Sequence, residues 1–513
     1  MLHQSSPMPR PSKRRREDDI QPSLPQTLSD ELVPTLAKHP RVALASDFAT
    51  FEIGRALDMP ALLLQPLATQ WNTDAAGAAP PTEPMANEIT TAADNQYENS
   101  DSVLGNLLEL LDLSELQSAA AIETRFSQIA SELLHNYRVE IQSSVGTEHL
   151  EILEAEFYLW KTGCHEDPFT HASPEQSQRG RWYFHRPPTR GASGELAMAT
   201  TVTHAGYRGG TRKGVDVTLG RAPPAVASKY FPHKTQASSS GAKLEKSADI
   251  VRGGALLRSV KRVSDGKVIS GPSLLVDEVL RLSGAKEIAE LVTVNWNGDI
   301  SAFPHSDPTE HPGQLSTSST PTRISTMYLV RAPMPTPTEN NRRSHKSDKD
   351  AVVDGKLRIF RSPRIGLDIS HPSILLPASK SPSSSVAALN HPRVKFIAQP
   401  YRFFVSPYLL TANGRGQTFV GVYDALVARG HCENDKELLG EIVRLTGVKG
   451  PTATKYLAEL RKGLAEGELT EWVGPKGKIV TSSITAWLRM IGTLRRLTSA
   501  TSTEQKGDSG SSG

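Results

Sequence analysis

An alternation of apolar and polar residues before position 160 constrains the fold more than any other feature of this 513-residue sequence. Within the run LEILEAEFYLW, residues 150–160, the regularly spaced apolar positions are Leu153, Ala155, Phe157 and Leu159. Because successive side chains of a strand point to opposite faces, this period predicts a β-strand with one face on an apolar core. The other face carries Glu154, Glu156 and Tyr158, and taken alone this pattern predicts a solvent-exposed strand face.

Further strand-like and helical runs follow along the chain. The predicted strands are YRVEIQS at 137–143, RWYFHR at 181–186, GVDVTLG at 214–220, GALLRSVKRV at 254–263, RISTMYLV at 323–330, KLRIF at 356–360 and YRFFVSPYLL at 401–410. Helices are expected over 103–116, 121–136 and 272–284, where apolar residues recur with helical spacing. The sequence contains no internal repeat.

Composition divides the chain into four regions. Hydrophobic residues make up only 37% of the chain and prolines number 36, so much of it is not expected to pack into a core. We expect residues 1–100 and 499–513 to be mostly disordered. A folded core is expected over 101–412 and a helical C-terminal module over 413–498. Polar loops at 221–248, 305–321, 334–351 and 378–388 look like surface insertions in the core.

Basic residues are concentrated in one part of the chain. Between positions 175 and 262 there are 16 Lys and Arg against 5 Asp and Glu, with aromatic residues among them. This composition predicts a surface that contacts the phosphate backbone of double-stranded DNA, through residues such as Arg208, Arg212 and Lys213. The alternative is a set of unrelated surface charges in loops.

Several features bear on the cellular location of the chain. It has two cysteines, and no apolar run approaches the ~20 residues of a membrane span, so a soluble intracellular protein that does not bind membranes is expected. The segment PSKRRRED at 11–18 is consistent with a nuclear localisation signal, which predicts the nucleus, with the cytoplasm as the alternative.

The C-terminal module contains a helix, a tight turn and a second helix between 437 and 463. Its turn, TGVKGPTA, resembles both a helix-hairpin-helix turn and the turn of a winged helix-turn-helix, with Lys449 where the hairpin usually has its second glycine. In either case the start of the second helix would offer free N–H groups to a DNA phosphate. The alternatives are an αα-hairpin that packs on the core and a surface for a protein partner.

The order of short motifs resembles that of the 3-methyladenine (alkyladenine) DNA glycosylase family over about residues 120–412. The motifs, in chain order, are EAEFY, DPFTH, GRWYFH, GVDVTLG, GALLRSV, GPSLL, SPRIG and PYRFFVSP. Each is short, and their collinear order carries the resemblance. It implies an α+β fold with a single antiparallel, curved-sheet core and packed helices.

The resemblance also implies roles for individual residues in the pocket that holds the flipped base. Glu156 corresponds to the general base, Tyr158 to a tyrosine beside the flipped base, and His171 to a histidine on its other side. Tyr183 and His185 occupy the positions of two family tyrosines, so His185 is a departure. Asp216 is a second departure, because the family has an asparagine that contacts the base edge there; the alternative is a structural partner of Arg212 or Lys213.

Two further residues acquire roles from the family. Tyr207 would be the tyrosine that fills the gap in the duplex, and Arg258 corresponds to the arginine of the LLR strand, which we expect to act in DNA binding. No lysine stands where the resemblance would suggest lyase chemistry. A metal site built from Cys164, His165, His171 and His185 lacks a common zinc spacing, so no metal and no cofactor are expected.

The resemblance therefore implies a monofunctional DNA glycosylase. Such an enzyme hydrolyses the N-glycosidic bond of an alkylated purine that has been flipped out of DNA, because the bond cannot be reached inside the stack. The alternative is a catalytically inactive nucleic-acid-binding or regulatory protein that retains the fold. The sequence does not identify the lesion, the pathway or the oligomeric state.

Overall fold

The computed structural model describes residues 107–187, 206–222, 250–304, 323–333, 352–353, 356–374, 388–431 and 434–507. All of them belong to one compact unit, residues 65–513. The expectations for residues 1–100, including the basic cluster at 13–16, and for most of the inserted loops lie outside the described residues.

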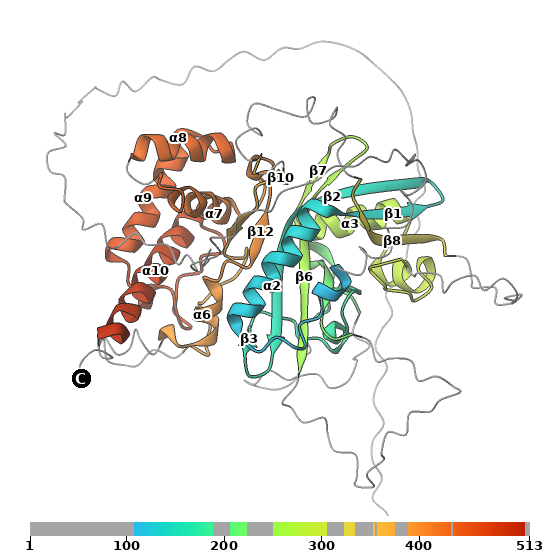
Figure 1. Cartoon of the computed structure of the whole chain (residues 1–513), viewed down its shortest axis with the longest axis horizontal. Helices are drawn as coiled ribbons and strands as arrows, with labels where there is room; N and C mark the ends of the chain where they lie inside the picture. The colour runs from blue at the N-terminus through green and yellow to red at the C-terminus, as the bar shows by residue number, and fades with distance from the viewer. Residues whose placement is uncertain are drawn as a thin grey trace, which may run out of the picture. The chain divides into compact units, whose positions relative to one another are not determined.

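A ten-stranded antiparallel sheet forms the centre of the described part of the chain (Figure 1). Its main path has the order β11-β12-β2-β6-β5-β4, and β1, β3, β7 and β8 attach to this path. The strands are β1 (Tyr137–Ser143), β2 (Gly146–Lys161), β3 (His165–Glu166), β4 (Trp182–Phe184), β5 (Val215–Leu219), β6 (Val251–Arg262), β7 (Val268–Ser270), β8 (Ser325–Arg331), β11 (Phe360–Ser362) and β12 (Arg402–Phe404). A separate pair consists of β9 (Val352–Val353) and β10 (Lys356–Leu357).

The predicted mixture of helices and an antiparallel sheet is therefore confirmed. β1 spans the predicted residues, whereas the segment 356–360 divides between β10 and the first residue of β11. In the segment 401–410 only Arg402–Phe404 is a strand, and Pro407–Leu409 forms a 3-10 turn. A proline has no N–H for a sheet ladder, so Pro407 ends the strand pairing there.

Helix α2 (Ala119–Ser131) packs on the apolar face of the sheet, where Phe126 stacks on Phe157 with ring centroids 4.7 Å apart. It continues into a π-helical turn, Glu132–Asn136, so the helix predicted at 121–136 is confirmed. The helix predicted at 103–116 is wrong in its described part, where only 107–110 is helical. Oδ1 of Asp112 accepts the N–H of Ser114 at 3.0 Å, and this local bond replaces a helical one.

The predicted exposed face of β2 is also wrong. Glu156 is 0% exposed and Glu154 is 3% exposed, so both faces of the strand are buried in this stretch. The chain covers the glutamates with arginines from β6 and β12, and a carboxylate can be buried when such partners are present. The alternation of residues located the strand but not what covers its polar face.

Helix α3 (Pro272–Ser283) packs on β6 and β1, and α6 (Pro392–Ile397) precedes β12. The C-terminal helices are α7 (Arg415–Val427), α8 (Asp435–Thr446), α9 (Gly450–Glu466) and α10 (Ile484–Gly507). α8, the turn at 447–449 and α9 form the predicted pair of helices joined by a tight turn. α7 packs closely on β11, because a Cβ at Gly421 would lie 2.7 Å from the carbonyl oxygen of Arg361.

α9 and α10 cross at small residues. A Cβ at Gly463 would lie 2.1 Å from the Arg489 carbonyl oxygen, and one at Gly492 would lie 2.2 Å from the Leu460 carbonyl oxygen. The missing side chains let the two backbones approach. Among the described helices, none is both long and apolar enough to cross a membrane.

Candidate functional site

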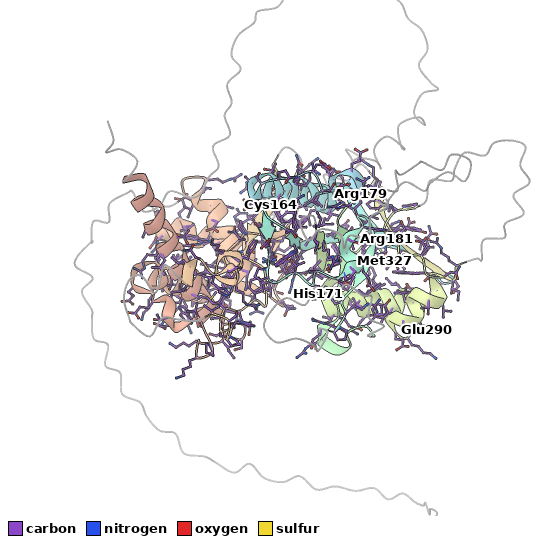
Figure 2. All side chains as sticks on the ribbon, turned by 90° about the horizontal axis from the view of Figure 1, so that it is seen from below. Cys164, His171, Arg179, Arg181, Glu290 and Met327 are labelled. Carbon is purple, nitrogen blue, oxygen red and sulfur yellow. The ribbon has the colours of Figure 1, made fainter. Side chains whose placement is uncertain are left out.

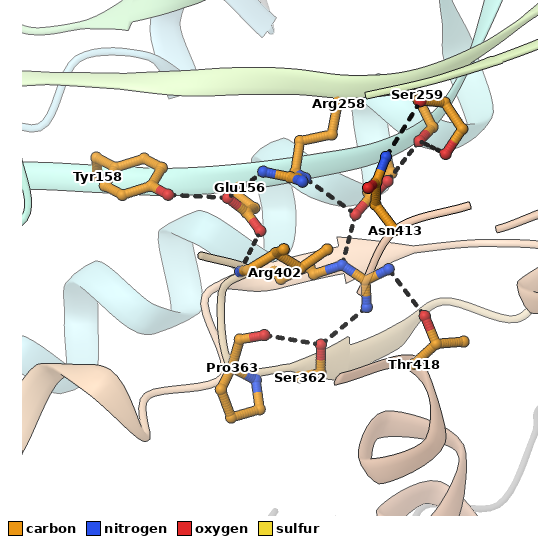
Figure 3. Close-up of polar contacts among 12 residues, drawn as sticks. Glu156, Tyr158, Arg258, Ser259, Ser362, Pro363, Arg402, Asn413 and Thr418 are labelled. Carbon is orange, nitrogen blue, oxygen red and sulfur yellow. Dashed lines mark hydrogen bonds and ion pairs between the residues drawn. The ribbon is translucent and has the colours of Figure 1, made fainter. Parts of the chain in front are cut away.

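Glu156 lies within β2, and its carboxylate is surrounded by hydrogen-bond donors (Figure 3). The Tyr158 hydroxyl donates to Oε2 at 2.8 Å, and Nη1 of Arg258 donates to the same oxygen at 3.3 Å. The backbone N–H of Ile365 donates to Oε1 at 2.7 Å. These donors bring together the EAEFY, GALLRSV and SPRIG segments, which are far apart in the sequence. Such an arrangement orients an ionised carboxylate.

A second carboxylate, Glu154, supports the first through shared arginines. Nε of Arg402 donates to Oε1 of Glu154 at 2.6 Å, and Nε of Arg258 lies 3.3 Å from the same oxygen. The guanidinium of Arg402 also donates to the hydroxyls of Ser362 and Thr418, both at 3.0 Å. Figure 3 shows the resulting chain of contacts from Tyr158 to Thr418 on α7. Two buried carboxylates and two buried arginines thus balance each other.

Opposing effects act on the acidity of Glu154. Burial alone would raise its pKa, but Arg402 and then Arg258 outweigh burial, so the pKa lies below its ordinary value of 4.5. Burial, and then the charge of Glu156, raises the pKa of Tyr158 well above its ordinary value. Tyr158 is therefore a neutral donor to Glu156 at neutral pH.

A second cluster lies on β4 and β5. Nε2 of His185 lies 2.9 Å from Oδ1 of Asp216, and Nε2 of Gln176 donates to Oδ2 of Asp216 at 3.1 Å. Asp216 is only 3% exposed. The structural alternative for Asp216 is therefore corrected: its partners are His185 and Gln176, whereas Lys213 pairs with Asp277.

The rings of His171, Tyr183 and His185 meet at this cluster. The His171 and His185 ring centroids are 4.3 Å apart, and the Tyr183 hydroxyl lies 3.4 Å from Nδ1 of His171. Desolvation, and then the neighbouring His185, lowers the pKa of His171 to about 3. Its imidazole is therefore neutral at pH 7, although the residue, labelled in Figure 2, keeps an exposed edge.

The register of the sheet relates the two clusters. Glu156 pairs with Leu256, Leu256 with Asp216, and Asp216 with Tyr183, so these side chains form one row across four strands. Directly paired residues share a face, and neighbouring strands are ~4.8 Å apart, so Glu156 and Asp216 are about 10 Å apart along the row. Gly254 lies beside the row, and a Cβ there would be 2.7 Å from Cβ of Asp216.

The structure places Tyr207 and its neighbours beside this row. The ring of Tyr207 lies under the guanidinium of Arg186, 4.0 Å from the ring centroid, and edge-on to Phe184. A wedge inserted into DNA would have to leave these contacts, so that role stays a prediction. Nε of Arg208 donates to the Arg186 carbonyl oxygen at 2.7 Å.

The other predicted DNA contacts are found in different surroundings. Arg212 is exposed at the end of a 3-10 turn, Gly210–Arg212, and Lys213 is ion-paired with Asp277 on α3. Arg258 is only 7% exposed and pairs with the two glutamates, so it does not face solvent as a DNA contact would. Lys449 is exposed and is the N-cap residue of α9.

Some residues of the site were not predicted from the sequence. Arg364 is 1% exposed, with its guanidinium carbon 4.4 Å from the Tyr158 ring centroid, and Arg402 bridges Glu154 to α7. Both lie within quoted motifs, SPRIG and PYRFFVSP, so an arginine within a motif was the available signal. The backbone donor Ile365 and the amide donor Gln176 had no signal in the sequence.

The four residues weighed as metal ligands are not brought together. Nδ1 of His165 lies 3.0 Å from the Leu159 carbonyl oxygen, and Nε2 lies 3.1 Å from the Tyr401 hydroxyl, whereas His171 and His185 belong to the Asp216 cluster. Within the described ranges, no group of three or more His, Cys, Asp or Glu side chains could hold a metal ion.

Comparison with known proteins gives a partial similarity to a viral protein. No protein family matches the chain. An uncharacterized protein of Acanthamoeba polyphaga mimivirus is 32% identical over 140 residues, which are 27% of this chain and 51% of the viral protein. The chain thus spans about half the length of the curated relative that it matches, and the name of that relative states no activity.

Proposed function

We propose that the chain is a monofunctional DNA glycosylase that hydrolyses the N-glycosidic bond of an alkylated purine flipped out of double-stranded DNA. The observation that carries the proposal is the set of donors on Glu156. Tyr158, Arg258 and the Ile365 N–H come from three of the motifs that resemble the glycosylase family, and all three contact one carboxylate. The same proposal includes localisation in the nucleus, which the basic segment at 11–18 indicates.

The chemistry follows from the charges and rings of the site. An ionised Glu156 would orient a water, take its proton as the water attacks C1′, and stabilise the positive charge that develops on the sugar. Tyr158 and the neutral ring of His171 would stack on the flipped base and replace part of its lost stacking. A purine alkylated on a ring nitrogen is already cationic in the nucleotide and is a good leaving group, so no covalent nucleophile is needed.

Asp216 would discriminate between bases. An ionised carboxylate only accepts hydrogen bonds, so it favours a cationic base or an exocyclic amino group and disfavours a carbonyl. In the structure it already accepts from His185 and Gln176, which leaves lone pairs for a base edge. This residue would therefore narrow the substrates toward positively charged purines.

A second candidate is a nucleic-acid-binding protein without turnover. It is favoured by the complete burial of Glu156, both of whose oxygens accept hydrogen bonds from the protein. A catalytic water would have to approach a carboxylate that is already surrounded by donors. The exposed Arg212 and Lys449 would serve binding in either candidate, and a protein partner for the C-terminal helices belongs to this second candidate.

The test is abasic-site formation by the full chain on duplex oligonucleotides that carry alkylated, deaminated or undamaged bases. We expect cleavage-sensitive sites on alkylated purines and a rate lower by about 10²-fold or more for Glu156→Gln. The matched control is Glu151→Gln on the same strand, whose side chain is 34% exposed and pairs with Lys261.

The outcomes separate the two candidates. Activity in the wild type and in Glu151→Gln, with loss in a folded Glu156→Gln protein, supports the glycosylase. Binding of the duplex without abasic sites on any lesion supports the non-catalytic candidate. Equal activity in Glu156→Gln and the wild type would remove Glu156 from the mechanism.

A further inference from the structure

A cavity of about 280 Å³ lies between the SPRIG turn and the first turns of α7 and α10. Its lining comes from residues 365–367, 412–415, 417, 480–481, 484 and 487. Ile365, which donates its N–H to Glu156, is also part of this lining. Ile365 thus connects the cavity to the candidate general base, and the other lining residues have no role in the glycosylase chemistry proposed above.

The first turn of α7 opens into this cavity without a cap. Its N-cap residue, Gly414, has a left-handed conformation with φ 66° and no side chain that could accept from the helix. The N–H groups of Arg415, Gly416 and Gln417 have no acceptor among the described residues. A helix start of this kind carries free donors and a partial positive charge, and both favour an anion.

Gln417 supplies an independent sign of a ligand. The residue is 8% exposed and lines the cavity, and its side-chain amide has no hydrogen-bond partner in the described part of the chain. Its amide is not among the fully enclosed polar atoms that lack a partner, so it opens to the cavity, where a bound molecule or water can satisfy it. α8, in contrast, has the side chain of Asn434 as a cap on the N–H of Lys436.

The charges around the cavity also suit an anion. Arg415 is one of the lining residues, its Nε donates to the Thr411 carbonyl oxygen at 2.5 Å, and within the described ranges its guanidinium forms no ion pair with an acidic side chain. Asp368 is the neighbouring acid, and its carboxylate is occupied by the N–H groups of Ser370 and Val480. Trp487, which is 3% exposed, and Ile484 form the apolar part of the lining.

We propose that this cavity is a phosphate site, held by the first turn of α7, the amide of Gln417 and the guanidinium of Arg415. We assign the phosphate to the DNA strand that carries the flipped nucleotide, and this assignment rests on the proposed function. A DNA strand has one phosphate per ~3.4 Å of helix axis. A phosphate within a few nucleotides of a base at Glu156 can therefore reach the cavity, since Ile365 contacts Glu156 and also lines the cavity. The site would fix the register of the strand on the pocket.

The phosphate site is tested first without DNA. The melting temperature of the full chain is measured in inorganic phosphate and in chloride at equal ionic strength, for the wild type, Gln417→Met and Gln417→Glu. We expect phosphate to raise the melting temperature of the wild type by more than it raises that of either variant, because Met removes the amide and Glu adds a negative charge. General salt effects of phosphate act on all three proteins alike.

The two variants also separate binding from folding. In chloride, Gln417→Met should be about as stable as the wild type, because the amide that it removes forms no hydrogen bond within the described part of the chain. Arg415→Gln should lose part of the phosphate effect, whereas the matched control Arg429→Gln, an exposed arginine just beyond the other end of α7, should keep it. A Gln417→Met protein that is less stable in chloride and keeps the full phosphate effect would overturn the site.

A second experiment identifies the source of the phosphate. Duplex affinity is measured by fluorescence anisotropy while chloride is replaced by phosphate at equal ionic strength. We expect phosphate to weaken wild-type binding several-fold and to leave Gln417→Glu unchanged, because the two ligands compete for one site. A phosphate effect on melting without competition against DNA would overturn the DNA assignment and identify free phosphate as the ligand. Neither result depends on abasic-site formation, so a failure of the glycosylase proposal remains distinguishable.

Discussion

The backbone N–H of Ile365 donates a 2.7 Å hydrogen bond to Oε1 of Glu156, across 209 positions of the sequence. A backbone donor cannot be removed by mutation of its own side chain, so this contact depends on the path of the turn that follows β11. The side-chain donors Tyr158 and Arg258 act on the other oxygen. The two oxygens of Glu156 therefore accept hydrogen bonds from different parts of the chain. Replacing either oxygen with a group that cannot accept would leave a donor without its partner.

We predict that Glu156→Gln destabilises the protein. The amide nitrogen would face either Ile365 N–H or the Tyr158 and Arg258 donors, and two buried donors would then oppose each other. The free energy of unfolding should fall by about 1–3 kcal/mol, measured by urea denaturation. Glu151→Gln, on the same strand, should remain within ~0.5 kcal/mol of the wild type. Equal stability of Glu156→Gln and the wild type would show that the carboxylate is not bound as described.

Acid should weaken the network around Glu154. Its folded pKa is below 4.5, so its contribution to stability is fully present above pH 4.5 and is lost as the pH falls through the folded value. The unfolding free energy of the wild type should therefore exceed that of Glu154→Gln at pH 6, and this difference should shrink on acidification. Parallel pH profiles for the two proteins would contradict the ion pairs of Glu154 with Arg402 and Arg258.

Arg212 and Lys213 should contribute unequally to DNA binding. Arg212→Glu should weaken binding on damaged and undamaged duplex alike and lower the salt slope by about 1, because an exposed cation facing a phosphate is lost. Asp277→Asn should strengthen binding, since it frees Lys213 from its ion pair. Fluorescence anisotropy at several salt concentrations measures both effects.

The matched control for this charge is Lys286→Glu, an exposed lysine outside the basic region. It should leave the salt slope of binding unchanged. If Arg212→Glu and Lys286→Glu weaken binding equally, the effect reflects net charge, and the basic region is not a binding surface.

Asp216 and His185 should act as a pair on substrate choice. Asp216→Asn and His185→Tyr each restore the residue of the family that the chain resembles, and a double-mutant cycle measures their coupling. On the proposed function, Asp216→Asn should shift the ratio of kcat/KM for cationic over neutral lesions toward neutral ones by about tenfold, which equals ~1.4 kcal/mol. A constant ratio with lower stability would make Asp216 a structural partner of His185.

Gly254→Ala should displace Asp216. The added Cβ would lie 2.7 Å from Cβ of Asp216, which is bonded to the backbone of β5 and cannot rotate away. We expect a loss of about 1–3 kcal/mol of unfolding free energy, measured by urea denaturation. The control is Gly209→Ala, where no atom lies within 4 Å of the added Cβ, and it should change stability by less than ~0.5 kcal/mol.

The sequence predicted strand positions well where local pattern decides them. β1 matches its predicted residues, and the apolar face of β2 is the one that packs on α2 through Phe157. The opposite face could not be predicted, because alternation does not distinguish water from Arg258 and Arg402 as the neighbours of a glutamate. Those arginines come from β6 and β12, which lie about 100 and 250 positions away in the sequence.

The arrangement of the predicted site residues likewise depends on contacts between distant parts of the sequence. The register of the sheet places Glu156, Asp216 and Tyr183 in one row, and this row depends on strand pairing that no local pattern reveals. The partner of Lys213, Asp277, lies on α3, whereas the alternative based on proximity in the sequence paired Arg212 or Lys213 with Asp216. Opposite charges that are close in the sequence are therefore a weak guide to ion pairs in this sheet, because its strands pair across long sequence separations.

The hydrogen bond from Arg402 to Thr418 limits which substitutions these residues can undergo during evolution. Arg402 also holds Glu154 and the hydroxyl of Ser362, so its guanidinium contacts residues from three other elements, β2, β11 and α7. A change at Arg402 alone would leave the buried Glu154 with Arg258 as its remaining partner, while a change at Glu154 alone would leave the buried Arg402 without the carboxylate that it pairs with. Substitutions at these positions are therefore expected to occur together, so in related chains the presence of Glu154 should be correlated with that of Arg402. The C-terminal helices should likewise be conserved together with the sheet.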